Sequence, residues 1–247
     1  MSVNSILYFG RKNCKYSENL KKFLATKTED LTYVESKKIF CKVPKNKILK
    51  KKYSYIICFR SFYILKKKLI NKALVAAINF HPSIPKYRGT GCVNFALYEN
   101  SQFYGSTCHM INEKVDNGKI LNLLKFRLKK NDTIDSVLKK TYPIMLRQAK
   151  SVLGLIFKDN NNIKKLIKKN KNIKWSKKLY KLKNLEDFYK VKLKCTKKEL
   201  INKIRATNTK FYKPYIVFNK KNYFYNKIKL RKPFVTLHNK NFYRSDF

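Results

Sequence analysis

The chain has 247 residues, of which 44% are hydrophobic and 14% aromatic, so it can bury a substantial core and is not a disordered polymer. Its 59 basic and 14 acidic side chains give a formal net charge of +45. No apolar run reaches the roughly 20 residues that a membrane span needs, and the N-terminus lacks the pattern of a signal peptide, so we predict a cytoplasmic protein without membrane contact.

Apolar runs of strand length alternate with helical patterns in the first half of the chain. One helix is expected after the N-cap Ser17, and a second helical pattern covers 64–72. This alternation predicts an α/β fold with a Rossmann-like, mostly parallel sheet and flanking helices. In such sheets, ligands bind beyond the carboxyl ends of the strands. The predicted strands are 5–10, 31–34, 53–59, 75–80 and 105–110.

A long apolar pattern follows these strands. It predicts a helix over 133–153, in which Pro143 should introduce a kink or start a second segment. The asparagines at 160–162 and the lysine run around them indicate a loop or an exposed arm rather than a core element.

The C-terminal part of the chain carries its own signals. Thr196 and Glu199 predict a capping box at the start of a helix. Two short apolar runs within 214–225 predict a β-hairpin. We therefore predict a main domain at 1–155 and a small basic extension at 156–247 that carries this helix and hairpin.

The lysine excess has two interpretations. Neutralisation of phosphates by many lysines would supply non-specific affinity for nucleic acid. Drift toward AT-rich codons is the alternative, because Lys, Asn, Ile, Tyr and Phe are abundant together. Only 8 of the 59 basic residues are arginine, and the densest run, 158–183, has eleven lysines and one acid. We therefore expect a solvated basic surface that binds nucleic acid weakly and non-specifically.

The cysteines and histidines do not form a recognisable metal site. The six cysteines show no regular spacing and no C-x-x-C pair, and His81, His109 and His238 do not cluster with them as zinc ligands do. We predict neither a metal nor a disulfide framework, which agrees with a reducing cytoplasm.

One segment carries groups suited to proton transfer. Asn79 and His81 lie at the end of a predicted strand, and Asp116 follows the next one. An amide can donate a hydrogen bond to a developing oxyanion, and a histidine can donate or accept a proton near neutral pH. Alone, an Asn-x-His is usually structural and an Asp-x-Gly is usually a turn, so a functional role for these residues requires matching motifs around them.

Five short motifs occur in order along this segment. In that order they resemble the formyltransferase family, which moves a formyl group from 10-formyltetrahydrofolate to an amine. The resemblance implies a folate-dependent enzyme in which Asn79 and protonated His81 stabilise the oxyanion, while Asp116 holds the imidazolium and takes the amine proton. The motifs are Asn79-Phe-His81, Ser83-Ile-Pro85, Tyr87-Arg88-Gly89, Gly105-Ser-Thr107 and Asp116-Asn-Gly118.

The resemblance also implies where the two substrates bind. The acceptor would contact Tyr87, Arg88 and Gly89, and Arg205 would make either a diphosphate contact or a structural one. His109 is expected to be packed in its strand rather than catalytic. The positions expected to hold the folate donor are Arg60, Ser61, Phe62, Ser83, Ile84, Pro85, Ile111, Asn112, Glu113 and Val115.

The loop after His81 bears on the identity of the acceptor. Methionyl-tRNA formyltransferases usually have one residue more there, and a C-terminal domain for which this chain is expected to be too short. The shorter His81-Pro-Ser-Ile-Pro85 resembles sugar N-formyltransferases, as does the stretch from Trp175 to Tyr215, which implies a nucleotide-linked amino sugar as acceptor. Two alternatives stay open: methionyl-tRNA as acceptor, and a non-catalytic basic RNA-binding protein on the same fold. The oligomeric state, including a dimer, stays open as well.

Overall fold

The computed structural model divides the chain into two compact units. The first comprises residues 1–88, 105–126 and 140–177, and the second comprises 89–104, 127–139 and 178–247. The residues that the structure describes are 3–37, 43–44, 48–210, 212–226 and 235–244.

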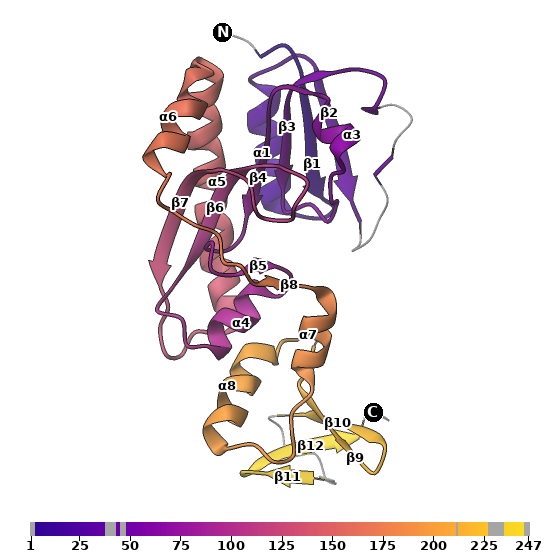
Figure 1. Cartoon of the computed structure of the whole chain (residues 1–247). Coiled ribbons are helices and arrows are strands. Elements are labelled where there is room, and N and C mark those ends of the chain that lie inside the picture. The colour runs from indigo at the N-terminus through magenta and orange to yellow at the C-terminus, as the bar shows by residue number, and fades with distance from the viewer. Residues whose placement is uncertain (1–2, 38–42, 45–47, 211, 227–234, 245–247) are drawn as a thin grey trace. The chain divides into compact units, whose positions relative to one another are not determined.

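A six-stranded sheet forms the centre of the first unit (Figure 1). Its strand order is β2-β1-β3-β4-β6-β7, with the first four strands parallel and β6 antiparallel to β4. The predicted Rossmann-like, mostly parallel sheet is therefore confirmed, although the sequence pattern did not indicate β7. The strands are β1 (Ile6–Arg11), β2 (Leu31–Ser36), β3 (Tyr53–Phe59), β4 (Ala73–His81), β6 (Phe103–Met110) and β7 (Ile120–Arg127).

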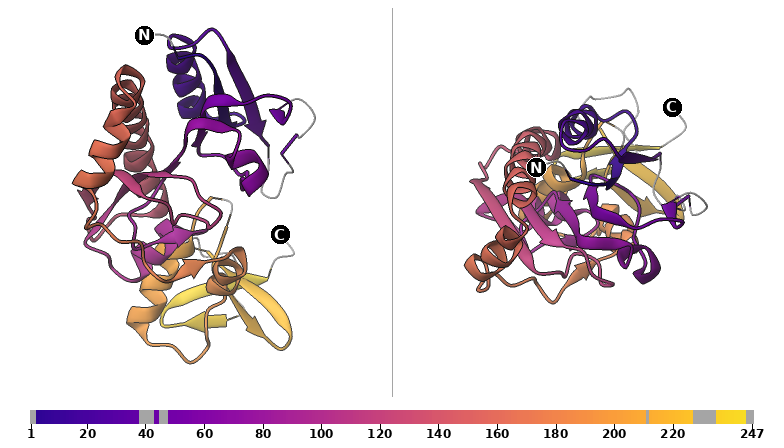
Figure 2. Two further views of the ribbon diagram at one scale, coloured as in Figure 1. Left: turned by 45° about the horizontal axis from the view of Figure 1, so that its top comes forward. Right: turned by 90° about the horizontal axis from the view of Figure 1, so that it is seen from above.

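Helices cover both faces of this sheet. Leu24 of α1 (Lys15–Ala25) and Val152 of α5 (Ile134–Lys158) belong to one core cluster on the first face. Leu69 of α3 (Lys67–Ile70) belongs to a second cluster on the opposite face. The helix expected over 64–72 is thus only four residues long. Figure 2 shows the strands and their flanking helices from two further directions.

The start of α1 differs from the prediction. Cys14, and not Ser17, is the N-cap residue, and Ser17 lies fully buried within the helix. The Ser17 hydroxyl accepts a hydrogen bond from the Arg11 amide at 3.2 Å, and its carbonyl accepts one from the Tyr8 hydroxyl at 3.0 Å. This serine therefore closes the loop between β1 and α1 instead of capping the helix.

The following helical region differs in part from the prediction. Helix α5 runs as one helix through Pro143, so of the two expected effects of the proline the start of a second segment is wrong, and the kink stays a prediction. The expected loop or arm after it contains α6 (Asn161–Lys169), in which Ile163 is buried and Leu166 packs against the core. Apolar residues at helical spacing anchor α6. The sequence predicts a loop there because asparagines and lysines outnumber these apolar residues.

The second unit combines three helices with a small antiparallel sheet of order β11-β12-β10-β9. The predicted capping box is confirmed, since the Thr196 hydroxyl accepts from the Glu199 amide at 3.2 Å and the Glu199 carboxylate accepts from the Thr196 amide at 2.7 Å. The predicted hairpin is confirmed as β9 and β10. The remaining elements of the chain are β5 (Arg88–Gly89), whose first residue belongs to the first unit, and, in the second unit, α4 (Cys92–Tyr98), α7 (Leu182–Tyr189), α8 (Lys197–Thr207), β8 (Leu179–Tyr180), β9 (Tyr215–Phe218), β10 (Lys221–Tyr225), β11 (Val235–Leu237) and β12 (Lys240–Arg244).

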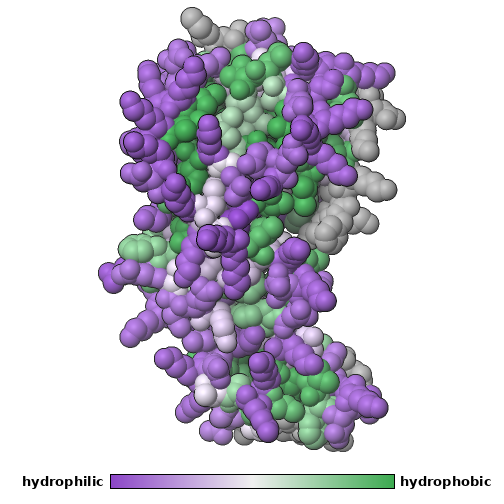
Figure 3. Space-filling model, in the orientation of Figure 1, coloured by the Kyte–Doolittle hydropathy of each residue, from purple (hydrophilic) through white to green (hydrophobic). Residues whose placement is uncertain are grey.

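The lysines lie on the outside of both units. Among the described residues no lysine is buried, and Figure 3 shows hydrophilic side chains spread over the visible face with apolar ones between them. Within the same residues, no helix is both long and apolar enough to cross a bilayer.

Candidate active site

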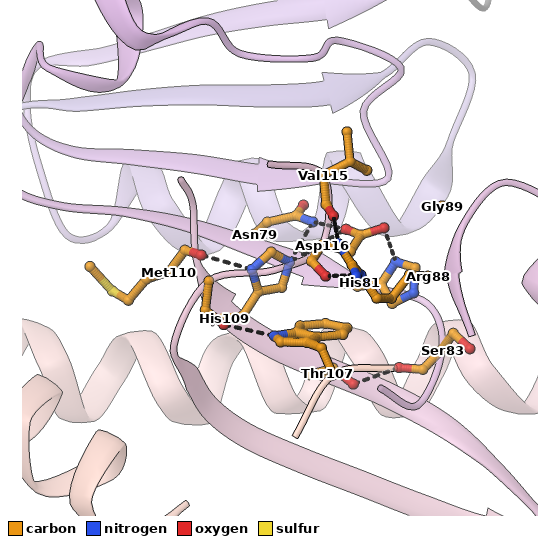
Figure 4. Close-up of polar contacts among 12 residues, drawn as sticks. Asn79, His81, Ser83, Arg88, Gly89, Thr107, His109, Met110, Val115 and Asp116 are labelled. Carbon is orange, nitrogen blue, oxygen red and sulfur yellow. Dashed lines mark hydrogen bonds and ion pairs between the residues drawn. The ribbon is translucent and has the colours of Figure 1, made fainter. Parts of the chain in front are cut away.

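The three side chains predicted to be catalytic come together at the carboxyl end of β4 (Figure 4). Asn79 and His81 are on β4 itself, and Asp116 lies in the turn region after β6. Asp116 adopts a φ of 44°, a left-handed conformation that aspartate tolerates better than most residues. All three belong to the first unit.

His81 lies between a carbonyl and a carboxylate. Its Nε2 is 2.8 Å from the Tyr87 carbonyl oxygen, so Nε2 carries a proton and donates it there. Its Nδ1 is 3.3 Å from the Asp116 carboxylate, and this contact is attractive when a proton lies between the two groups. Only 4% of His81 and 8% of Asp116 are exposed, so the pair is shielded from water.

His109 is an additional member of the site. The antiparallel register of β4 and β6 places it opposite Asn79. Its Nδ1 donates to the Met110 carbonyl at 2.8 Å, which leaves Nε2 to accept from the Asn79 side-chain amide at 3.1 Å. His109 is packed in its strand, as expected, yet it also orients the Asn79 side-chain amide. The sequence shows neither the strand direction nor the register that brings it there.

The second amide proton of Asn79 is weakly engaged. The Asn79 nitrogen lies 3.5 Å from the Asp116 carboxylate, which is long for a hydrogen bond. That proton therefore remains able to turn to a stronger acceptor, such as an oxyanion that forms beside it.

Arg88 fixes the backbone around Asp116. Its guanidinium donates to the carbonyls of Val115, Asp116 and Ser176 at 2.7–2.8 Å, and only 8% of the residue is exposed. Arg88 therefore fixes the position of the backbone that carries the Asp116 carboxylate. Its assignment to acceptor binding stays a prediction.

Replacing Arg88 by lysine should destabilise the protein. An ammonium cannot reproduce the planar fork that reaches three carbonyls, and each buried carbonyl left unpaired costs about 1–3 kcal/mol. We expect a lower urea midpoint than for Arg147→Lys, a control on an exposed arginine of α5. Equal midpoints for the two variants would contradict this role of Arg88.

Trp175 packs against both histidines and is held there by a hydrogen bond to Gly118. A Cβ added at Gly118 would lie 1.7 Å from the Met110 carbonyl oxygen, so only glycine fits this approach. The Trp175 indole donates to the Gly118 carbonyl at 2.7 Å and meets the rings of His81 and His109 edge-on at centroid distances of 5.9 and 5.0 Å. Sequence reasoning did not place Trp175 in the site, because nothing local links it to residues so far away along the chain.

Replacing Gly118 by alanine should therefore disturb the site and the fold together. The new methyl group must displace the Met110 carbonyl, which also holds the His109 ring. Gly154→Ala is the matched control, since nothing lies within 4 Å of that added methyl group and alanine favours the helix. We expect Gly118→Ala to melt at a lower temperature than the wild type while Gly154→Ala does not, as measured by circular dichroism. A Gly118→Ala protein with unchanged melting would contradict the close approach.

The remaining predicted positions differ in their accessibility. Ser83, Ile84 and Pro85 are buried, and the Ser83 hydroxyl finds no hydrogen-bond partner among the described residues. The other positions expected to hold the folate donor, within 60–62 and 111–115, are instead partly or fully exposed, which suits contact with a bound molecule.

Gly89 and Arg205 belong to the second unit, whereas Asn79, His81 and Asp116 belong to the first. The Arg205 guanidinium donates to the carbonyls of Asp132 and Lys129 and to the Asn100 side chain at 2.9–3.0 Å. These are the contacts of a structural arginine, one of the two roles expected for it. Gly89 has a φ of +87° and approaches the Tyr180 carbonyl, which leaves no room for a side chain. Their assignment to acceptor binding stays a prediction.

Comparison with known proteins agrees with this geometry. A family model described as formyl transferase matches residues 11–144, more than half of the chain. The chain therefore belongs to the formyl transferase family, as its ordered motifs predict.

Individual relatives are more distant. The chain is 29% identical to a methionyl-tRNA formyltransferase from Natranaerobius thermophilus over 146 residues, 59% of this chain and 45% of that protein. A sugar N-formyltransferase structure from a Shewanella species aligns with a TM-score of 0.65 at 20% identity, covering 94% of this chain and 99% of that one. The structure of an N-formyltransferase from Helicobacter canadensis, solved with folinic acid and dTDP-3-aminofucose, aligns with a TM-score of 0.64 at 18% identity. The alignment covers 92% of this chain and 90% of that one. The matched segments span less than half the length of the first curated relatives.

Proposed function

We propose that this protein transfers a formyl group from 10-formyltetrahydrofolate to the amine of a nucleotide-linked amino sugar. The observation that carries the proposal is the group of Asn79, His81 and Asp116 at the carboxyl end of β4, in which the Asp116 carboxylate lies within 3.5 Å of both the Asn79 amide and the His81 imidazole, in a chain of the formyl transferase family. The three residues supply an amide donor, an imidazole and a carboxylate, which are the groups that acyl transfer to an amine requires.

Each residue has a distinct part in this chemistry. The donor supplies an activated formyl carbonyl when bound. The weakly engaged amide proton of Asn79 and the proton at His81 Nδ1 would be directed at the developing oxyanion. Asp116 would accept the proton that the attacking amine loses, directly or through a water. His109 and Arg88 keep the amide and the carboxylate in place.

The exposed segments flanking this group are suited to hold the donor. Residues 60–62 and 111–115 are at least partly accessible. Ser83 to Pro85 are buried and would support the site without contacting the donor over a large area. We assign the donor to the two exposed segments.

Two observations support a sugar acceptor. The loop from His81 to Pro85 is short, as in sugar N-formyltransferases, and solved members of that group match this chain over nearly their whole length. Methionyl-tRNA is the second candidate, favoured by the net charge of +45 and by curated relatives that carry that activity.

The test is product formation with 10-formyltetrahydrofolate and a panel of nucleotide-linked amino sugars, with methionyl-tRNA alongside. We expect a formylated sugar and no formylated tRNA. Formylated tRNA alone would move the acceptor to translation and would give the positive charge a role. An absence of both products together with no folate binding would favour the non-catalytic, RNA-binding alternative.

A further inference from the structure

A short segment that follows α6 crosses the candidate active site at Trp175 and Ser176. The Trp175 indole N–H donates to the Gly118 carbonyl at 2.7 Å, in the turn region that also carries Asp116. The Ser176 amide donates to the Pro85 carbonyl at 3.0 Å, in the loop that follows β4. Two adjacent residues therefore tie the loop after β4 to the backbone beside Asp116.

Arg88 joins the same pieces of backbone. Its guanidinium donates to the Ser176 carbonyl at 2.8 Å, and it also donates to the carbonyls of Val115 and Asp116. The crossing segment is thus hydrogen-bonded to both loops, which leaves the Trp175 indole few alternative positions.

The indole packs edge-on against two imidazoles. Its ring centroid lies 5.9 Å from that of His81 at an interplanar angle of 65°, and 5.0 Å from that of His109 at 82°. This arrangement is favourable between rings, and it opposes rotation of either imidazole. Rotation would break the contacts of His81 Nε2 with the Tyr87 carbonyl and of His109 Nδ1 with the Met110 carbonyl. Trp175 therefore adds to the contacts that hold both rings in one orientation.

Trp175 also covers these rings. It is itself partly exposed, whereas only 4% of His81, 3% of His109 and 8% of Asp116 are exposed. Removal of most of the indole would open a path for water to the contact between His81 and Asp116 at 3.3 Å. Water would weaken that contact, because it raises the effective dielectric constant around the two groups.

Water at this place would also compete with the acceptor for the formyl group. In the transfer, the amine nitrogen forms a bond to the formyl carbon, and the bond from that carbon to N10 of the folate breaks. The electron pair of the broken bond stays on N10, which gains in net the proton that the amine loses. With water as the attacking group, the same bond breaks and the products are formate and tetrahydrofolate. A site closed to water suppresses this side reaction.

We propose that Trp175 is a positioning residue that directs the formyl group to the amine rather than to water. It holds His81 and His109 in one orientation and excludes water from the contact between His81 and Asp116. The inference rests on the proposed function, since a partition between amine and water exists only for an enzyme that uses the formyl donor. Trp175 itself takes no part in the bond changes.

The test compares Trp175→Leu and Trp175→Phe with Phe23→Leu, which shortens an aromatic side chain of α1 that packs against the core of the same unit. Formate and formylated acceptor are counted from a donor labelled in the formyl group. We expect Trp175→Leu to lower kcat by about 10- to 100-fold and to raise the share of label released as formate by about tenfold or more. The KM values of both substrates should stay within roughly threefold of the wild type, because neither substrate loses a direct contact.

The other two variants separate positioning from stability. Trp175→Phe keeps a ring against the histidines and should show smaller changes in the same direction; it carries the test if the leucine variant does not fold. Phe23→Leu should partition the label as the wild type does, even if it melts at a lower temperature. An unchanged share of formate in the Trp175 variants would overturn the proposal, as would raised KM values with a wild-type kcat.

The orientation of the rings is tested without turnover by ¹⁵N NMR of protein labelled in its three histidines. In the wild type, His109 should carry its proton on Nδ1 and His81 should carry one on Nε2. Trp175→Leu should give mixed protonation patterns at these two residues. His238, in the second unit, is the internal reference and should not change.

Identical spectra of His81 and His109 in the wild type and in Trp175→Leu would overturn the positioning role. If the wild type does not use the formyl donor, the proposed function fails, and the NMR measurement still decides whether Trp175 holds the two rings.

Discussion

Asp116→Asn should lower kcat for formyl transfer by about 100- to 10,000-fold, the usual range for a group that moves a proton in the transition state. The carboxylate contacts His81 Nδ1 at 3.3 Å and faces the Asn79 amide. An amide at this position can neither accept the proton of the amine nor carry the negative charge beside the imidazole. The rate is measured with saturating donor and acceptor.

The fold should survive this substitution. Asparagine tolerates the left-handed backbone of Asp116 and has the same shape, while Arg88 binds the main chain rather than the side chain there. Asp135→Asn, at an exposed position in the first turn of α5, is the matched control and should leave kcat unchanged. An Asp116→Asn enzyme with wild-type kcat would show that this carboxylate does not take part in proton transfer.

Asn79→Ala should lower kcat by about 100- to 1,000-fold, which is typical for the loss of one oxyanion donor. The variant removes the amide that His109 orients at 3.1 Å and leaves His81 as the remaining donor to the oxyanion. Because the amide acts mainly on the transition state, the KM values of both substrates should change much less than kcat.

A matched substitution separates this effect from a general loss of structure. Asn202→Ala, in α8 of the second unit, removes an amide that makes no side-chain hydrogen bond among the described residues and should retain wild-type kcat. If Asn79→Ala raised the KM values and left kcat intact, Asn79 would be a binding residue rather than an oxyanion donor.

The sequence predicts the parallel half of the sheet because each strand there is a short apolar run of its own. Strand β3 lies at 53–59 as predicted, and the capping box of Thr196 is visible as a local pattern. Helix α6 was missed because three apolar residues are scattered among asparagines and lysines. In that case tertiary packing, rather than local composition, decides the structure.

The candidate site divides in a similar way. Asn79, His81 and Asp116 could be assigned because they belong to ordered motifs, whereas His109 and Trp175 enter through pairing and packing. The contacts of Arg88 with three backbone carbonyls could not be predicted either, because they depend on how loops distant in the chain converge. Long-range geometry therefore adds the residues that hold Asn79 and Asp116 in place, rather than the three side chains that the motifs predict.

The most direct test of the account is a single-turnover reaction with 10-formyltetrahydrofolate labelled with ¹³C in the formyl group and a nucleotide-linked amino sugar, followed by NMR. The wild type should convert the label into a formamide on the sugar, and Asp116→Asn should not do so on the same timescale. Release of the label only as formate, or equal formamide formation by both proteins, would contradict formyl transfer through Asn79, His81 and Asp116.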